Sequence, residues 1–313
     1  MADVKIYYKI DGDTCYYSNT IYDANYQTWN NTSTAGGKNV SIVLTVGKFT
    51  FPTNAKNLFR GCNNSSFNMS NWVTSGCTNM GGLFASCRGL TTLDLSNFNT
   101  SSCTDMSDMF DGCSNLVSIN LSGFNTSNVT NMVDMFGYCT SLKSIDVSNF
   151  NTAKVQYFDG MFHSCKALTS LNLHNFSTIS AAHLHGMFQA CENLKWLDIY
   201  NFTVHQTQVS VQVYDMFSGC KNLERVFIRP NQDWGSQDII DTNMFANCEK
   251  ILNWDGTVDK TRANNTKPNG YFGVYGIWMY DYLVFEKNED SWVQTEVYLK
   301  DSDLWNKSQA MIR

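Results

Sequence analysis

The chain has 313 residues, of which 43% are hydrophobic and 16% are charged, and its formal net charge is -6. The hydrophobic content predicts a sizeable core and excludes a disordered chain, while the acidic balance argues against a nucleic-acid or anionic-membrane binder. The sequence contains no apolar run long enough to span a membrane and no secretory signal at its N-terminus, so we expect no membrane insertion.

The first segment, residues 1–54, lacks the repeat that follows and predicts β-structure. Its apolar residues Val4, Ile6, Tyr8 and Ile10 alternate with polar ones, and "VSIVLTVGKFTF" (residues 40–51) predicts a further strand. We expect a small β-rich domain that either caps the first coil of the repeat or docks to an assembly.

Residues 55–255 repeat a Met-Phe-x-x-Cys signature, with small departures in some units. Its phenylalanine recurs every 25 to 29 residues, at Phe59, Phe84, Phe110, Phe136, Phe162, Phe188, Phe217 and Phe245. A cysteine follows each of them by three residues, and further apolar columns recur every 26 residues. Such a period predicts a solenoid of about eight stacked coils, because one short unit cannot bury its apolar face alone.

Each unit predicts a helix, a strand and a turn. Met106, Met109, Phe110 and Cys113 lie at i, i+3, i+4 and i+7, which is the apolar stripe of a short helix, and Gly112 suits a left-handed residue near its end. The alternation in "LTTLDLS" predicts a strand, and "NFNTS" a polar turn. The predicted fold class is therefore an α/β solenoid, a leucine-rich-repeat-like stack of helix–strand coils flanked by small β-rich terminal domains.

Ten of the eleven cysteines fall in repeat columns. The column of Cys77 and Cys103 continues as Val129 and Val155, which indicates packing. One cysteine per coil forms a line rather than a tetrahedron, which argues against zinc. Disulfides between neighbouring coils would fit the Cα spacing, but side chains stacked in register keep their Cβ atoms about 4.8 Å apart, slightly beyond the usual disulfide distance. We therefore predict reduced thiols in the core, with Cys15 unassigned.

The units "LDLSNFNTSSCTDMSDMFDGCSNL" and "INLSGFNTSNVTNMVDMFGYCTSL" resemble the BspA-like leucine-rich repeats, which are common in bacterial surface proteins. The resemblance covers roughly residues 55–255 and implies an adhesin or recognition surface rather than an enzyme. The last two coils depart from it, since their spacing lengthens and "VFIRPNQDWGS" replaces the usual turn.

Residues 256–313 form a second non-repetitive segment, which is aromatic and strand-like, and "KNED" predicts a hairpin tip. Its end, "VYLKDSDLWNKSQAMIR", resembles short modules near the ends of phage structural proteins. The aromatic residues either cap the stack or form an interface, so a homo-oligomer through the terminal domains is possible.

No catalytic motif or cofactor-binding glycine pattern occurs, so we expect neither an enzyme nor a cofactor. All five histidines lie between His163 and His205, but they occupy different repeat columns, so no metal site is predicted. Asp108 and Asp134 recur with the repeat, which predicts a solvated helix face.

The outward face of the predicted strands changes along the stack. Small polar residues in the early coils give way to aromatic and charged ones, which are typical of binding surfaces. The candidate binding residues are His174, Trp196, Asp198, Tyr200, Arg225, Phe227 and Arg229. The alternative is that the C-terminal domain folds over this end and buries them.

These observations predict a non-enzymatic recognition, adhesion or structural protein. The first placement is a phage virion component (tail, fibre or head decoration), made in the host cytoplasm and contacting other virion proteins or a host surface protein or glycan. The resemblance of the tail and the missing signal peptide favour it. The alternative is a bacterial or protist BspA-like cell-surface adhesin.

Overall fold

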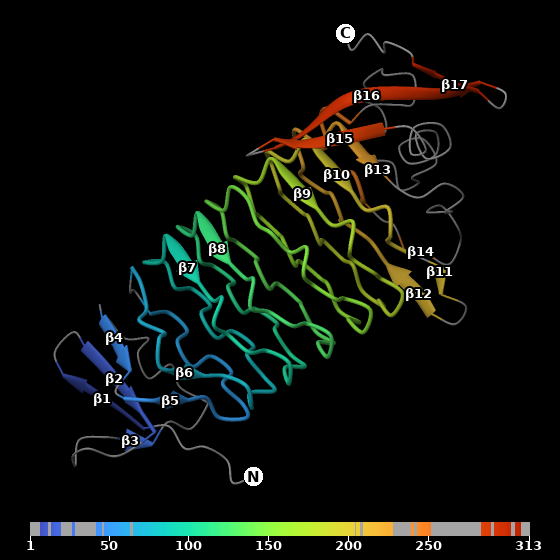
Figure 1. The fold of residues 1–313 in the computed structure, drawn as a ribbon. Helices are drawn as coiled ribbons and strands as arrows, with labels where there is room; N and C mark the ends of the chain where they lie inside the picture. Colours follow the sequence, from blue (N-terminus) through green and yellow to red (C-terminus); the bar gives the residue numbers. More distant parts are fainter. Residues whose placement is uncertain are drawn as a thin grey trace.

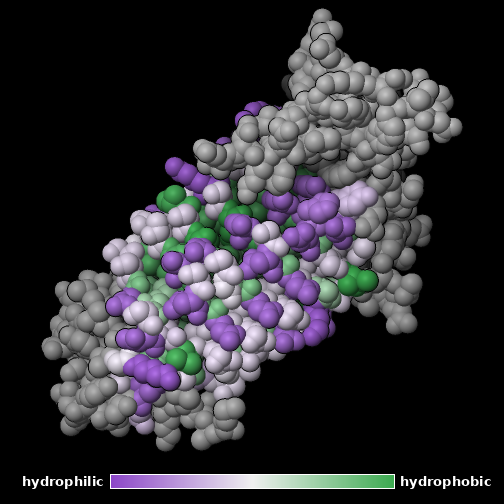
Figure 2. All heavy atoms as spheres, in the orientation of Figure 1, coloured by the Kyte–Doolittle hydropathy of each residue, from purple (hydrophilic) through white to green (hydrophobic). Residues whose placement is uncertain are grey.

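The computed structural model shows a ladder of stacked coils that runs between an N-terminal and a C-terminal group of strands (Figure 1). The structure describes residues 7–11, 14–19, 27–28, 42–45, 47–62, 65–203, 205–206, 209–227, 239–240, 243–251, 283–288, 291–301 and 304–307. The central coils carry mostly hydrophilic or intermediate residues on the visible surface, because their apolar columns point inward (Figure 2).

The N-terminal sheet has the order β3-β1-β2-β4 and contacts the first coil through Tyr17. The Tyr17 side chain is buried, its hydroxyl donates to the Leu58 carbonyl oxygen (3.1 Å), and its ring meets Phe59 edge-on at 5.3 Å. Tyr17 thus packs the N-terminal sheet against the first coil. Its strands are β1 (Tyr7–Asp11), β2 (Thr14–Ser18), β3 (Gln27–Thr28) and β4 (Ile42–Thr45).

The single strand predicted over residues 40–51 is two strands with different partners. β4 pairs with β2 in the N-terminal sheet, whereas β5 (Phe49–Thr50) pairs in parallel with β6 (Trp72–Val73). Phe49 is fully buried in the main core. The stack therefore begins ahead of residue 55, and the bounds of the terminal domains otherwise stay a prediction.

The short parallel strands predicted on one face of the coils are confirmed. β7 and β8 pair in register with Leu93 opposite Ile119, and β9, β10 and β13 pair with Leu171, Leu197 and Val226 aligned. The coil between β8 and β9 has no strand of its own. These strands are β7 (Thr92–Asp94), β8 (Ser118–Asn120), β9 (Ser170–Asn172), β10 (Trp196–Asp198) and β13 (Arg225–Phe227).

The predicted helices are wrong, because no residue within the described ranges lies in a helix. In the coil of residues 106–113, the N–H groups of Met106, Asp108, Phe110 and Gly112 donate to carbonyl oxygens of the next coil. The N–H groups of Met109, Asp111 and Cys113 donate three residues back instead, and that of Ser107 donates to the Asp105 Oδ1 atom. No i to i−4 bonds remain to form a helix, and the backbone joins the coils on this second face as well.

Two left-handed residues in each coil also prevent a helix here. In the coil of 106–113 they are Asp108 (φ 55°) and Gly112 (φ 71°). The equivalents of Asp108 in other coils are asparagine, aspartate or glycine, the residues that adopt this backbone conformation most readily. Positive φ at Gly112 was expected, but it belongs to a turn segment and not to a helix end.

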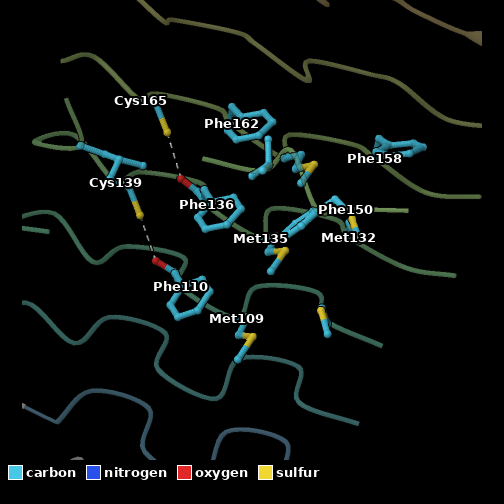
Figure 3. Close-up of a cluster of buried hydrophobic side chains, with 14 of the residues drawn as sticks. Met109, Phe110, Met132, Met135, Phe136, Cys139, Phe150, Phe158, Phe162 and Cys165 are labelled. Atoms are coloured by element: carbon cyan, nitrogen blue, oxygen red, sulfur yellow. Dashed lines mark hydrogen bonds between the residues drawn. The ribbon is translucent and has the colours of Figure 1, made fainter. Parts of the chain in front are cut away.

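The core consists of columns of apolar side chains, several of them identical from coil to coil, that stack along the ladder (Figure 3). The Phe136 ring lies parallel to those of Phe110 and Phe162, with centroids 5.4 and 5.5 Å away. A second column runs from Phe98 to Phe176 with centroid spacings of 6.2 to 6.3 Å. The apolar columns found in the sequence are therefore confirmed as the core.

The "NFNTS" turns contain a hydrogen-bonded column of buried threonines. The Thr126 hydroxyl donates to the Asn151 carbonyl oxygen (3.0 Å) and accepts from the Asn151 N–H (2.7 Å). Thr74, Thr100, Thr152 and Thr178 make the same pair of bonds to their next coils. Each threonine hydroxyl thus bonds both the carbonyl oxygen and the N–H of one residue in the next coil, as a backbone partner would in a sheet.

The remaining strands lie beyond the regular coils. β15 and β16 form an antiparallel hairpin in which Asn288 pairs with Ser291, which confirms the predicted tip at "KNED". These strands are β11 (His205–Gln206), β12 (Val209–Gln212), β14 (Ile239–Ile240), β15 (Leu283–Asn288), β16 (Ser291–Asp301) and β17 (Leu304–Lys307).

Candidate recognition surfaces

The repeated cysteines are buried and reduced, as the sequence predicted. Ten cysteines are buried without a disulfide, whereas the side chain of Cys15 lies outside the described residues. The Cys139 thiol donates to the Phe110 carbonyl oxygen (3.3 Å), which also accepts from the Cys113 N–H (Figure 3). Burial raises the pKa of the Cys103 thiol to about 12. These thiols hold neighbouring coils together and are unsuited to nucleophilic chemistry.

Three of the predicted binding residues come together on the strand face. His174 follows β9 and Tyr200 follows β10, and their rings stack with centroids 5.9 Å apart and planes 14° from parallel. His174 Nδ1 lies 3.7 Å from the Asp198 Oδ2 atom, and the His174 side chain is 54% exposed. A phenol, an imidazole and a carboxylate thus share one accessible patch.

Asp198 has a structural role as well. Its Oδ1 atom accepts a hydrogen bond from the Tyr200 N–H (2.9 Å), which closes a tight turn after β10. The same turn follows Asp94, Asn120, Asp146 and Asn172 in the preceding coils. The column therefore requires an aspartate or asparagine, and this turn fixes the carboxylate beside His174.

Trp196 completes what we call the strand-face cluster: His174, Trp196, Asp198 and Tyr200. Trp196 and Asp198 flank the buried Leu197 on β10, so they share the outward face, and both are partly exposed. Arg225 pairs in register with Trp196, and Phe227 with Asp198, but the positions of their side chains are not described. Arg229 lies outside the described residues.

A second surface, which the sequence reasoning missed, lies on the turn face of the coils. Here each of three histidines contacts a tyrosine of a neighbouring coil, with centroids 4.7 Å apart for Tyr138 and His163, 5.3 Å for Tyr157 and His183, and 3.9 Å for His185 and Tyr214. We call these six residues the turn-face stripe. The sequence did not reveal these contacts, because it predicts a helix here. The tyrosines and histidines of neighbouring coils become neighbours in space only when the turn segments pair in register.

Carboxylates accompany the turn-face stripe. Asp159 Oδ2 lies 3.9 Å from His183 Nδ1, and Asp215 Oδ2 lies 3.8 Å from His185 Nε2. Burial, with the neighbouring carboxylates of Asp108, Asp111 and Asp159, raises the pKa of Asp134 to about 6. Asp108 and Asp134 are therefore partly buried turn residues, which corrects the predicted solvated helix face.

Neither surface resembles a metal centre. No three histidine, cysteine, aspartate or glutamate side chains gather closely enough to ligate an ion in the part of the chain that the structure describes. Within the same ranges, we find no helix with the length and apolar character needed to cross a membrane. What both surfaces offer is stacking, hydrogen bonding and charge.

Comparison with known proteins identifies the repeat. The structure is similar to the crystal structure of a leucine-rich repeat protein from Bacteroides ovatus ATCC 8483, with 14% identity, a TM-score of 0.42, and coverage of 79% of this chain and 80% of that one. No curated protein matches the sequence. A family model matches residues 53–145 and 143–257, and the chain therefore belongs to the family DUF285, described as "Mycoplasma protein of unknown function".

Proposed function

We propose that the chain is a non-enzymatic recognition protein that binds a host surface protein or glycan through the strand-face cluster. The observation that carries this proposal is the change in two outward columns. Residues equivalent to His174 and Tyr200 in earlier coils are Ser96, Ser122 and Ser148, and Trp196 follows a column of threonine and serine. The inward columns stay apolar throughout, so packing does not require this change.

We further propose a place at a bacterial cell surface, the alternative that the sequence left open. The family is described from Mycoplasma proteins, which favours a bacterial source. The virion placement depends on the resemblance of the C-terminal tail, and the comparisons do not support it. A homo-oligomer through the terminal domains stays a prediction.

The repeat itself supplies variants that test the strand-face cluster. Trp196→Ser and Tyr200→Ser each introduce the residue that their column carries in earlier coils, so the fold should tolerate both. The control combines Thr92→Ser with Ser96→Ala, which alters the same two columns in the coil of β7. Both proteins are compared with the unaltered chain on a glycan array and on host cells.

We expect the double variant at Trp196 and Tyr200 to lose about tenfold or more in affinity, because exposed aromatic side chains dominate recognition surfaces. The control should bind like the unaltered chain. Equal binding by all three proteins would remove the strand-face cluster from consideration.

A further inference from the structure

The turn face carries negative charge that no lysine or arginine of the same segments balances, and the basic side chains beside its carboxylates there are the histidines His183 and His185. Six successive turn segments, residues 79–86, 105–112, 131–138, 157–164, 183–190 and 212–219, contain no lysine or arginine. They contain the aspartates Asp105, Asp108, Asp111, Asp134, Asp159 and Asp215. Because the coils are in register, these carboxylates lie along one face.

The middle of this face is the most crowded part. Asp134 and Asp159 are only partly exposed, and Asp134 is surrounded by the carboxylates of Asp108, Asp111 and Asp159. Lys56 and Arg60 of the first coil act on Asp108, but the influences on Asp134 are burial and other carboxylates. A cation supplied from outside would therefore be stabilised here.

Aromatic rings lie beside these carboxylates. Tyr138 is 50% exposed and Tyr157 is 40% exposed, although both belong to regular, well-packed coils. The rings of the turn-face stripe span three successive boundaries between coils. Arginine and lysine side chains bind favourably over the face of such rings, and arginine also pairs with carboxylates.

We propose that the turn-face stripe is a docking surface for a basic segment of a partner protein, whose arginine or lysine side chains lie on the tyrosine rings and pair with the adjacent aspartates. Charge complementarity selects this partner over an acidic glycan or an anionic membrane, which the carboxylates would repel. The proposal goes beyond the recognition proposed for the strand-face cluster, because it uses a different face and a different chemistry.

The repeat again supplies variants that keep the fold. Tyr138 has a φ of 55°, and Gly112 and Gly219 occupy its column with positive φ, so Tyr138→Gly removes a ring without strain. Tyr157→Asn introduces the residue of Asn131 in the same column. These two substitutions form the ring variant.

The charge variant combines Asp134→Gly, which introduces the residue of Gly160 in the same column, with Asp159→Asn, which keeps the Oδ1 atom that accepts a hydrogen bond from the His185 N–H. Its control, Asp94→Asn with Asp146→Asn, also removes two charges. Asn120 makes the same turn in that column, so the control should fold normally.

The experiment measures fluorescence anisotropy of a labelled peptide of alternating arginine and serine, titrated with each full-length protein at low and moderate salt. We expect binding that weakens with salt, and a loss of about tenfold for the ring variant and for the charge variant but not for the control. An equal loss in the control would show attraction by net charge only and overturn the proposal. Unchanged binding by the ring variant, or no binding by the unaltered chain, would overturn it as well.

Discussion

The column of buried threonines provides the sharpest test of how the coils are held together. Thr126→Val preserves the shape of the side chain but removes the hydroxyl that bonds both the Asn151 carbonyl oxygen and the Asn151 N–H. Two hydrogen bonds are lost and two backbone groups lose their partners, in a site where Thr126 is 1% exposed. We expect the free energy of unfolding to fall by about 2–4 kcal/mol.

Two further variants separate the hydroxyl from the rest of the side chain. Thr126→Ser keeps both hydrogen bonds and removes one buried methyl group, so it should cost about 1 kcal/mol. Thr92→Val alters an exposed threonine of β7 and should change stability by about 0.5 kcal/mol or less. Urea unfolding followed by circular dichroism measures all three, provided that the slope of each transition is unchanged. A cost for Thr126→Val no greater than that for Thr92→Val would refute the reasoning.

Three other predictions concern charge, backbone and thiols. The pKa of Asp134 is raised from 3.8 to about 6 on folding, so its contribution to stability should decrease as pH rises from about 4 to 6. The unaltered chain should therefore lose free energy of unfolding between pH 5 and pH 7.5, and urea unfolding should show a smaller loss for Asp134→Gly. Gly160→Ala should destabilise the protein by about 1–2 kcal/mol, because φ is +58° and the Asp134 carboxylate, whose Oδ1 atom would lie 2.0 Å from the new Cβ, would have to move aside; Gly76→Ala, with open space around it, is the control in thermal unfolding. The ten buried cysteines should resist a thiol reagent until urea unfolds the chain, and rapid labelling of most of them in the native state would contradict the buried column.

The sequence alone predicted much of the stack, because packing repeats with the chain. A residue such as Phe136 must meet its counterparts in both neighbouring coils, so its spacing is fixed and visible. The strand containing Leu93 follows from simple alternation. The buried cysteines followed from their regular recurrence, although their hydrogen bonds to carbonyl oxygens did not.

The helix prediction failed because periodicity reports which side chains face inward and not how the backbone is bonded. Met106, Met109, Phe110 and Cys113 are all buried, as a helical stripe requires, yet their backbone bonds run to the next coil or three residues back. The sequence did contain evidence against a helix, because the column of Asp108 holds only asparagine, aspartate or glycine in the coils of the repeat. Such a column indicates a left-handed residue in every coil, which a helix cannot contain.

Because of the helix prediction, the turn-face stripe was also missed, although it is one of the two candidate binding surfaces. If the segment were a helix, its polar residues would point in several directions. Residues at equivalent positions in successive coils would then not be expected to form one surface. In register, Tyr138 meets His163, and Tyr157 meets His183. The histidines between His163 and His205, which had no explanation in the sequence, thus become partners of tyrosines in neighbouring coils where the structure describes their side chains.

Both candidate surfaces vary in the same part of the stack, and this has a physical reason. Inward columns and turn residues are constrained by contacts with two neighbouring coils, so a change there weakens two interfaces. Outward positions such as Tyr200 and Tyr157 contact a histidine of a neighbouring coil through partly exposed rings, and earlier coils carry Ser148 and Asn131 in the same columns, so these positions can change without loss of the fold. Large side chains gather on both faces in the coils of β9 and β10 and in the coils next to them. We expect a chain in which these outward columns carry the serine, asparagine and glycine of earlier coils to keep its stability and to lose both proposed kinds of binding. That result would place the specificity of this protein in the residues that do not repeat.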